Sequence, residues 1–186
     1  MTVREAQRLF TVEEYRRMAE AGIFHEDDRV ELIEGQIIQM TAIGSRRAAC
    51  VKHLNKLLIR EVGDSGIGGA QDPVILPDIT EPEPDLTVLR PRDDFYAAGH
   101  PVPEDVLLLI EVSDTSLEYD RDVKVPLPAQ AGILEAWAMD LANEKMHVSW
   151  QPTDGFYRDT RSSGRSGSVS PQALPNLMVS VEDVLG

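Results

Sequence analysis

The sequence predicts a mixed α/β domain built around a central β-sheet. Residues 46–62 place apolar side chains at the spacing of an amphipathic helix. Residues 106–112 (VLLLIEV) are almost continuously apolar, which is typical of a strand buried on both faces. Shorter strand-like runs lie on either side. The resulting order of helix, hairpin, helix, strands, helix and strands favours helices packed on a sheet.

The first elements are expected to be a short helix and a β-hairpin. Thr11 has the character of an N-cap, Glu14 completes a capping box, and Gly22 is expected to end the helix. In residues 29–40 (RVELIEGQIIQM), two apolar runs flank a Glu-Gly pair. That arrangement predicts a hairpin with its turn at Glu34 and Gly35.

The middle of the chain is expected to pass from helix to loop to strand. After the helix over 46–62, four glycines within 63–69 predict a loop. Strands are expected at 73–77 and 86–89, followed by the buried strand over 106–112.

The last third is expected to add a helix, two strands and a closing segment. Residues 117–131 are helix-like, but their two prolines predict a helix that is kinked or starts late. Strands are expected at 135–140 and 145–151, and residues 152–168 are expected to be rich in loops, with a hairpin near Phe156 and Tyr157. The apolar end, Leu177 to Leu185, is predicted to pack onto the core. With no repeat and no long linker, the chain is predicted to be one domain over residues 1–186.

Composition narrows the class of protein. Of 186 residues, 42% are apolar, and 18 Lys and Arg stand against 32 Asp and Glu, for a net charge of -14. A surface that binds nucleic acid everywhere is excluded, because such surfaces are basic. One cysteine, Cys50, excludes an internal disulfide framework and is expected in the core. Without an apolar run of membrane-spanning length or a signal-peptide pattern, we expect a cytoplasmic protein with no membrane partner.

Two carboxylates carry the strongest chemical signal. Asp85 precedes a short apolar strand, and Glu111 lies near the end of the buried strand over 106–112. A carboxylate inside an apolar run is costly unless it is paired or binds a metal. Carboxylates from neighbouring strands suit Mg²⁺, which prefers oxygen ligands and retains several waters. The structural alternative is that Asp85 caps a turn while Glu111 pairs with a nearby Lys or Arg.

A second feature is the pair Asp120 and Lys124, four residues apart in the helix-like segment. This spacing fits an ordinary ion pair on one helix face. It equally allows Lys124 to reach the carboxylates and stabilise charge on an attacking water or a phosphate.

A third feature is a concentration of basic residues on an acidic chain. Five of them fall on or at the start of the helix over 46–62, namely Arg46, Arg47, Lys52, Lys56 and Arg60. Such a stripe could contact DNA phosphates, which attract Lys and Arg regardless of sequence. It could also be a solvated helix face. The segment 158–167 (RDTRSSGRSG) adds three arginines, either as a second mobile contact or as a plain exposed loop.

Several blocks together resemble the Uma-two family of bacterial candidate restriction endonucleases, a branch of the PD-(D/E)XK nuclease superfamily. The resemblance covers nearly the whole chain and is carried by the blocks ELIEGQIIQM (31–40), IGSRRAACVKHLN (43–55), EPEPDLTVLRPRDDFY (81–96), EDVLLLIEVSDTSLEYDRDVK (104–124) and AGILEAW (131–137). It implies a restriction-endonuclease-like fold, with a central mixed sheet flanked by helices and preceded by a helix and hairpin.

The resemblance also implies roles for single residues. Asp85 and Glu111 match the two metal-binding carboxylates, and Glu31 matches an additional acidic position of the site. The superfamily's usual lysine position is Ser113 here, and Lys124 takes that role in the following helix. The implied cofactor is Mg²⁺ (or Mn²⁺).

The chain departs from the family at two further positions. Arg47 stands where a His is common, and Pro128 stands where an aromatic residue is common. The function implied is a metal-dependent endonuclease that hydrolyses DNA phosphodiester bonds. The alternative is a catalytically inactive nuclease-fold protein that acts in binding or assembly. A third possibility, hydrolysis of a small phosphorylated metabolite, would need a closed pocket.

We also expect a homodimer, because nucleases that cut duplexes commonly pair two sites and two-fold dimers are the commonest oligomers. Its surface is expected to use Trp137, Trp150 and Phe156 of the late strands.

Overall fold

A computed structural model describes residues 7–25, 27–77, 79–114 and 126–186 of the chain. A six-stranded sheet forms its centre, with strand order β3-β4-β5-β6-β7-β8. Neighbouring strands are antiparallel except for β5 and β6, which run parallel. The sheet strands are β3 (Ile67–Gly69), β4 (Leu86–Leu89), β5 (Val106–Ser113), β6 (Glu135–Asp140), β7 (Lys145–Thr153) and β8 (Phe156–Gly164).

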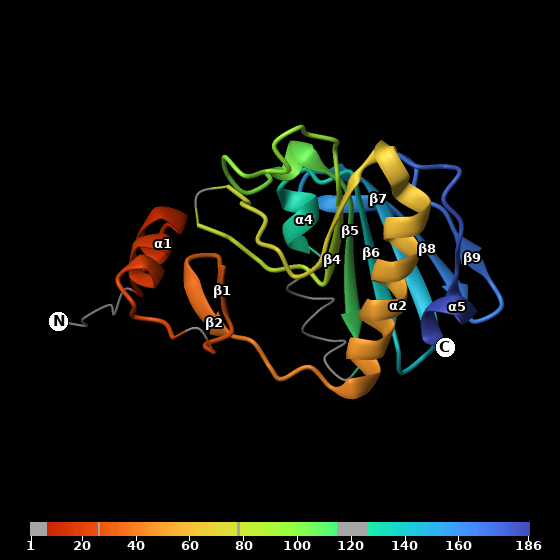
Figure 1. Cartoon of the computed structure of the whole chain (residues 1–186), viewed down its shortest axis with the longest axis horizontal. Coiled ribbons are helices and arrows are strands. Elements are labelled where there is room, and N and C mark those ends of the chain that lie inside the picture. Colours follow the sequence, from red (N-terminus) through yellow and green to blue (C-terminus); the bar gives the residue numbers. More distant parts are fainter. Residues whose placement is uncertain (1–6, 26, 78, 115–125) are drawn as a thin grey trace.

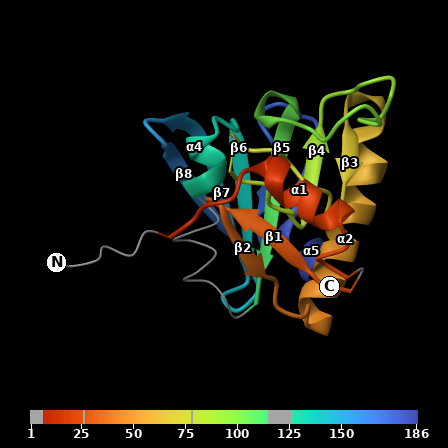
Figure 2. The same ribbon diagram turned by 90° about the vertical axis from the view of Figure 1, so that its left-hand side faces the viewer.

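In the part of the chain that the structure describes, two helices cover one face of this sheet, and the N-terminal helix and hairpin lie on the other (Figures 1 and 2). The covering helices are α2 (Ser45–Val62) and α5 (Val181–Leu185), the second preceded by the small ladder of β9 (Ser168–Val169) and β10 (Val179–Ser180). The opposite side carries α1 (Val12–Glu20), the hairpin of β1 (Val30–Ile33) and β2 (Gln36–Gln39), and the short helix α4 (Pro126–Gln130). This is the mixed sheet flanked by helices that the sequence predicts.

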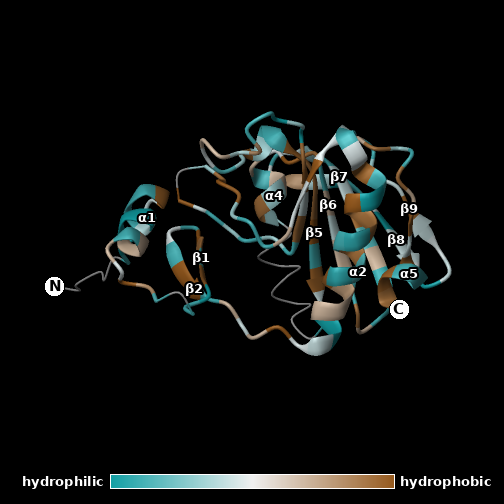
Figure 3. Ribbon diagram, viewed as in Figure 1, coloured by the Kyte–Doolittle hydropathy of each residue, from teal (hydrophilic) through white to brown (hydrophobic). Residues whose placement is uncertain are grey.

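Two apolar clusters hold these layers together, one on each face of the sheet. Under α2 and α5, buried helix residues such as Leu54 and Leu58 pack on alternate residues of β4 to β7, such as Ile110 and Trp137. Leu109 points to the other face and joins a smaller cluster with Ile33 and Leu127. The central strand β5 therefore contributes apolar residues to both clusters, and Figure 3 colours much of β5 as hydrophobic.

The predicted N-terminal elements are confirmed. Thr11 and Glu14 form a capping box at the start of α1. The hairpin turns at Glu34 and Gly35, both with positive φ (48° and 76°), as a type I′ turn requires. The helix over 46–62, the strands at 86–89, 106–112, 135–140 and 145–151, and the packing of the C-terminal segment are confirmed as well.

Three expectations about local structure are wrong. Residues 73–77 form no strand, only an isolated bridge between Leu76 and Thr80. Residues 67–69 form β3 rather than loop, because glycine permits a close approach to β4: a Cβ at Gly69 would lie 2.8 Å from Oγ1 of Thr87. Residues 156–164 form the long strand β8 rather than loop, so most of the arginine-bearing segment 158–167 is sheet edge.

The hairpin of β7 and β8 turns at Asp154 and Gly155, whose positive φ values are 52° and 82°. An Asp-Gly pair between strand-like runs is a strong hairpin signal. The hairpin predicted near Phe156 and Tyr157 is therefore confirmed, with its turn at the two residues just before Phe156.

Of the helix predicted over 117–131, the structure describes only the part from residue 126 onward. Within the described residues the helix begins at Pro126, and residues 117–125 of that prediction lie outside the described part of the chain. The interface expectation for Trp137 is wrong, because its side chain is fully buried in the core. Trp150 is partly buried against the same core, whereas Phe156 is exposed. Cys50 is buried, as expected.

Candidate nuclease site

One predicted carboxylate, Glu111, lies on β5, and the other, Asp85, immediately precedes the neighbouring antiparallel strand β4. Leu86, the first residue of β4, pairs with Ile110, and the backbone N–H of Val112 donates to Asp85, so Asp85 lies beside the carboxyl end of β5. Asp85 directly precedes β4, and Glu111 lies near the carboxyl end of β5. The fold thus brings together two acidic residues that are 26 positions apart in the sequence.

Asp85 is held by three N–H donors. Its side chain is 1% exposed, and its Oδ2 accepts hydrogen bonds from the backbone N–H of Val112 (2.9 Å) and from Nε (3.2 Å) and Nη2 (2.9 Å) of Arg47. The arginine compensates the cost of burying the carboxylate charge. Asp85 therefore does not simply cap a turn, since it fastens α2 to the end of β5.

Glu111 is buried in β5, one residue before Val112, whose backbone N–H bonds to Asp85. It shares its face of β5 with Leu109 and Ser113, opposite to the residues that pack under α2. Ser113 is also buried. Lys124 and Asp120 lie outside the described residues, so the proposed lysine role stays a prediction.

Glu31 approaches the site through the N-terminal hairpin. Leu32 and Glu81 exchange backbone hydrogen bonds, which fixes β1 beside the segment that leads to Asp85. The buried carboxylate of Glu31 accepts a hydrogen bond of 3.4 Å from the backbone N–H of Glu83. Glu31 is thereby tied to the chain two residues before Asp85.

The same segment carries further acidic groups. Glu81 is buried and pairs with Nε of Arg16 at 2.9 Å. Glu83 is half-buried, and burial raises the pKa of its carboxyl, an effect that Arg29 opposes and that the nearby Glu31 and Glu81 reinforce. The approach to Asp85 is consequently rich in negative charge, which favours a positively charged ligand there.

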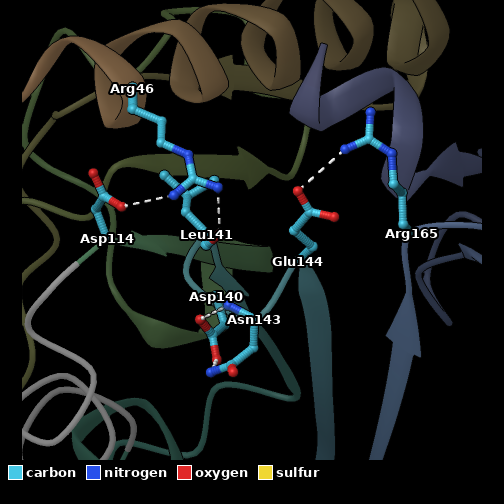
Figure 4. Close-up of polar contacts among 7 residues, drawn as sticks. All are labelled: Arg46, Asp114, Asp140, Leu141, Asn143, Glu144 and Arg165. Carbon is cyan, nitrogen blue, oxygen red and sulfur yellow. Dashed lines mark hydrogen bonds and ion pairs between the residues drawn. The ribbon is translucent and has the colours of Figure 1, made fainter.

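The first turn of α2 delivers two arginines to this end of the sheet. Arg46 donates to the backbone oxygen of Leu141 (2.6 Å) and to the carboxylate of Asp114 (3.3 Å), contacts drawn in Figure 4. Arg47 reaches Asp85 instead. Of the predicted phosphate-binding stripe, Lys52, Lys56 and Arg60 remain on the exposed face of α2.

Sequence reasoning grouped Arg47 with the stripe and so missed its partner. Helix geometry could have predicted this. Lys56 follows Arg47 by nine residues, and nine steps of about 100° amount to two and a half turns, so the two side chains lie on opposite sides of the helix. Arg47 instead continues the buried line of Cys50, Leu54 and Leu58, which follow it at intervals of three or four residues.

The residues present fit a magnesium or manganese ion. Within the described ranges, no group of three or more His, Cys, Asp and Glu side chains is arranged to hold a metal ion. Mg²⁺, however, is commonly held by one or two carboxylates, with waters and substrate oxygens completing its shell. Asp85 and Glu111 are carboxylates of the kind that such a site uses, and Oδ2 of Asp85 already accepts from Arg47.

A separate cleft of about 560 Å³ lies at the far end of β4 and β5. Its lining includes Val62, Arg90 and Leu107, so it is removed from Asp85 and Glu111. It therefore gives no support to the small-metabolite reading of the carboxylate pair. Among the described helices, none combines the length and apolar character that a bilayer crossing requires.

Comparison with known proteins agrees with this architecture. A solved structure from Anabaena variabilis ATCC 29413, titled a putative nuclease belonging to DUF820, superposes with a TM-score of 0.71. The likeness covers 95% of this chain and 97% of that one at 16% sequence identity, so it shows the fold. No curated protein gives a significant match. The family Uma2, described as "Putative restriction endonuclease", matches residues 12–182. The chain therefore belongs to the Uma2 family and has the fold of a restriction-endonuclease-like nuclease.

Proposed function

We propose that this protein is a metal-dependent endonuclease that hydrolyses phosphodiester bonds of DNA. The observation that carries the proposal is the pair of buried carboxylates, Asp85 immediately before β4 and Glu111 near the end of the neighbouring strand β5. Membership of the Uma2 family supports the same choice.

Asp85 and Glu111 would hold Mg²⁺ or Mn²⁺, with Glu31 as an additional acidic group of the site. When bound, the cation would polarise a phosphoryl oxygen and lower the pKa of a bound water. In the reaction, the oxygen of water forms a bond to phosphorus while one phosphorus–oxygen ester bond breaks, and a proton reaches the leaving oxygen. Lys124 would stabilise the negative charge that develops on the phosphate.

DNA would be held by the exposed basic side of α2. Lys52, Lys56 and Arg60 follow one another every four residues on that side of the helix. The chain is otherwise acidic, so this line is where phosphates meet the least repulsion. Arg46 stands at its beginning, close to the carboxylate end of the sheet.

The alternative is a catalytically inactive protein that acts in binding or assembly. One observation favours it: Oδ2 of Asp85 already accepts from a cationic side chain, that of Arg47. An ion pair between these residues could have replaced a metal.

The deciding experiment is calorimetric titration of the full chain with Mn²⁺ and Mg²⁺, followed by cleavage of supercoiled plasmid DNA. We expect both binding and cleavage in the wild type and neither in the double variant Asp85→Asn with Glu111→Gln. The matched control is Asp94→Asn with Glu104→Gln, which removes the same charge outside the site. Metal binding without cleavage of any DNA form would favour the alternative. Absence of metal binding by the wild type would remove the basis of the proposal.

A further inference from the structure

Oδ2 of Asp85 already accepts three hydrogen bonds. It accepts from Val112 N–H and from two N–H groups of Arg47, although a carboxylate oxygen offers about two lone pairs. The Val112 donor is fixed, because it belongs to the backbone of β5. Arg47 is the donor that can leave, since it sits on a long side chain that is 18% exposed.

We propose that Arg47 competes with the divalent cation for Asp85 and thereby sets the metal concentration at which the site fills. A cation that takes Oδ2 must displace the guanidinium. A cation that takes the other oxygen of Asp85 must tolerate a positive charge beside it, which the buried setting screens poorly. Arg47 weakens metal binding in either case. This inference rests on the metal site of the proposed function.

The test is the Mn²⁺ dissociation constant, measured by calorimetry on the wild type, Arg47→Gln and Arg47→Lys. We expect Arg47→Gln to bind Mn²⁺ about tenfold more tightly than the wild type, within the usual range of coupling between competing ligands. Arg47→Lys keeps the charge but loses the two-donor fork, so it should lie between them. If Arg47→Gln fails to fold, the comparison of Arg47→Lys with the wild type still tests the proposal.

The matched control is Arg92→Gln, which breaks an arginine–carboxylate contact, to Asp94, beyond the carboxyl end of β4, whereas Asp85 precedes that strand. Its Mn²⁺ affinity should stay close to that of the wild type. A merely structural role for Arg47 would lower metal affinity or leave it unchanged, and either result overturns the proposal while the metal site stands. If neither the wild type nor any variant binds Mn²⁺, both the metal site and the competition by Arg47 are rejected. Binding only after removal of Arg47 would support the competition most strongly.

A second inference concerns the edge of the sheet and rests on a different observation. β8 is nine residues long and ends the six-stranded order, so its outer edge carries unpaired backbone groups as far as the described residues go. The opposite edge, β3, has only three residues. A long open edge is a template for pairing with another strand.

The side chains of β8 match a second copy of the same strand. In an antiparallel pair that overlaps all of Phe156–Gly164, Thr160 lies on the two-fold axis and Asp159 faces Arg161 of the other copy. This register, which pairs every residue of β8, therefore also forms two pairs between Asp159 of one copy and Arg161 of the other. In the described part of the chain, no ion pair occupies Asp159 or Arg161.

We infer that the protein forms a homodimer in which β8 pairs with β8 of a second copy. Sedimentation equilibrium tests this with Asp159→Arg, Arg161→Asp and the double exchange. Each single variant places like charges opposite each other twice and should weaken the dimer about tenfold or more, whereas the double exchange should restore it. A monomeric wild type, or single variants that dimerise as well as the wild type, would overturn this interface.

Discussion

The backbone N–H of Val112 donates a 2.9 Å hydrogen bond to the carboxylate of Asp85. This bond crosses from the last part of β5 to the residue that precedes β4, and Arg47 of α2 closes the arrangement from the other side. Three elements thus meet at one carboxylate oxygen.

Asp85→Asn is expected to destabilise the fold. The amide can still accept from Val112, but Arg47 loses its charged partner, and breaking such a pair costs about 3 kcal/mol. Urea denaturation followed by circular dichroism measures the change. Asp94→Asn, which disrupts an exposed pair with Arg92, is the control and should leave the midpoint almost unchanged. Equal midpoints for Asp85→Asn and the wild type would show that the buried contact contributes little.

The stability of the fold should depend on pH through Glu135. Its oxygens accept from Nε1 of Trp137 (2.6 Å) and the backbone N–H of Gln172 (2.7 Å), yet burial dominates and raises the pKa of the carboxyl above 4.5. The folded state therefore holds this proton more tightly than the unfolded state. Glu135 contributes full stability below about pH 4.5 and loses it as the pH rises through the higher folded value.

The measurement is the difference in unfolding free energy between the wild type and Glu135→Gln from about pH 4 to pH 8. We expect the wild type to lose stability relative to the variant as the pH rises, because only the wild type must ionise a buried carboxyl. A difference that stays constant across this range would contradict the assignment.

Cys50 should be chemically silent in the folded protein. Burial, assisted by the charge of Asp85, raises the pKa of its thiol to about 12, so roughly one molecule in ten thousand carries a thiolate at pH 8. Ellman's reagent should react only after unfolding in urea. Cys50→Ala combined with Ser166→Cys places a thiol at an exposed position and should react at once. Rapid reaction of native Cys50 would show that α2 opens readily.

Gly35→Ala should destabilise the N-terminal hairpin. Gly35 has φ +76°, and a Cβ there would lie 2.6 Å from Cβ of Leu9. Left-handed backbone strain alone costs about 1–3 kcal/mol, and the clash adds to it. Gly99→Ala is the control, because a Cβ at that position meets nothing within 4 Å. Thermal denaturation should separate the two variants clearly, and matched midpoints would count against the close approach of residue 9.

Lys52→Gln, Lys56→Gln and Arg60→Gln together should weaken DNA binding and make it less sensitive to salt. Each phosphate contact contributes about 0.9 to the slope of log affinity against log salt concentration, so the slope should fall by about 2.7. Fluorescence anisotropy with a labelled duplex measures it. Arg90→Gln with Lys145→Gln removes exposed charges elsewhere and should preserve most of the slope. An unchanged slope in the triple variant would exclude this face of α2.

Local pattern was enough to predict most of the elements. The capping box at Thr11, the Glu-Gly turn, the apolar spacing of 46–62 and the run VLLLIEV each specify structure from neighbours in the sequence. The errors arose where tertiary contact decides. The glycine-rich residues 67–69 become a strand only because β4 accepts them, and 73–77 remain irregular despite an apolar run.

The sequence by itself determined the α/β class, the family resemblance and the two carboxylates worth attention. It could not determine which cation faces Asp85, because that depends on how the first turn of α2 lands on the ends of β4 and β5. The tertiary structure placed Arg47 there and left Lys56 on the solvent side of the same helix. It also buried Trp137 and left β8 as a long edge. The physical reason is common to these cases: burial and strand pairing are set by contacts between segments far apart in the chain, which no local spacing encodes.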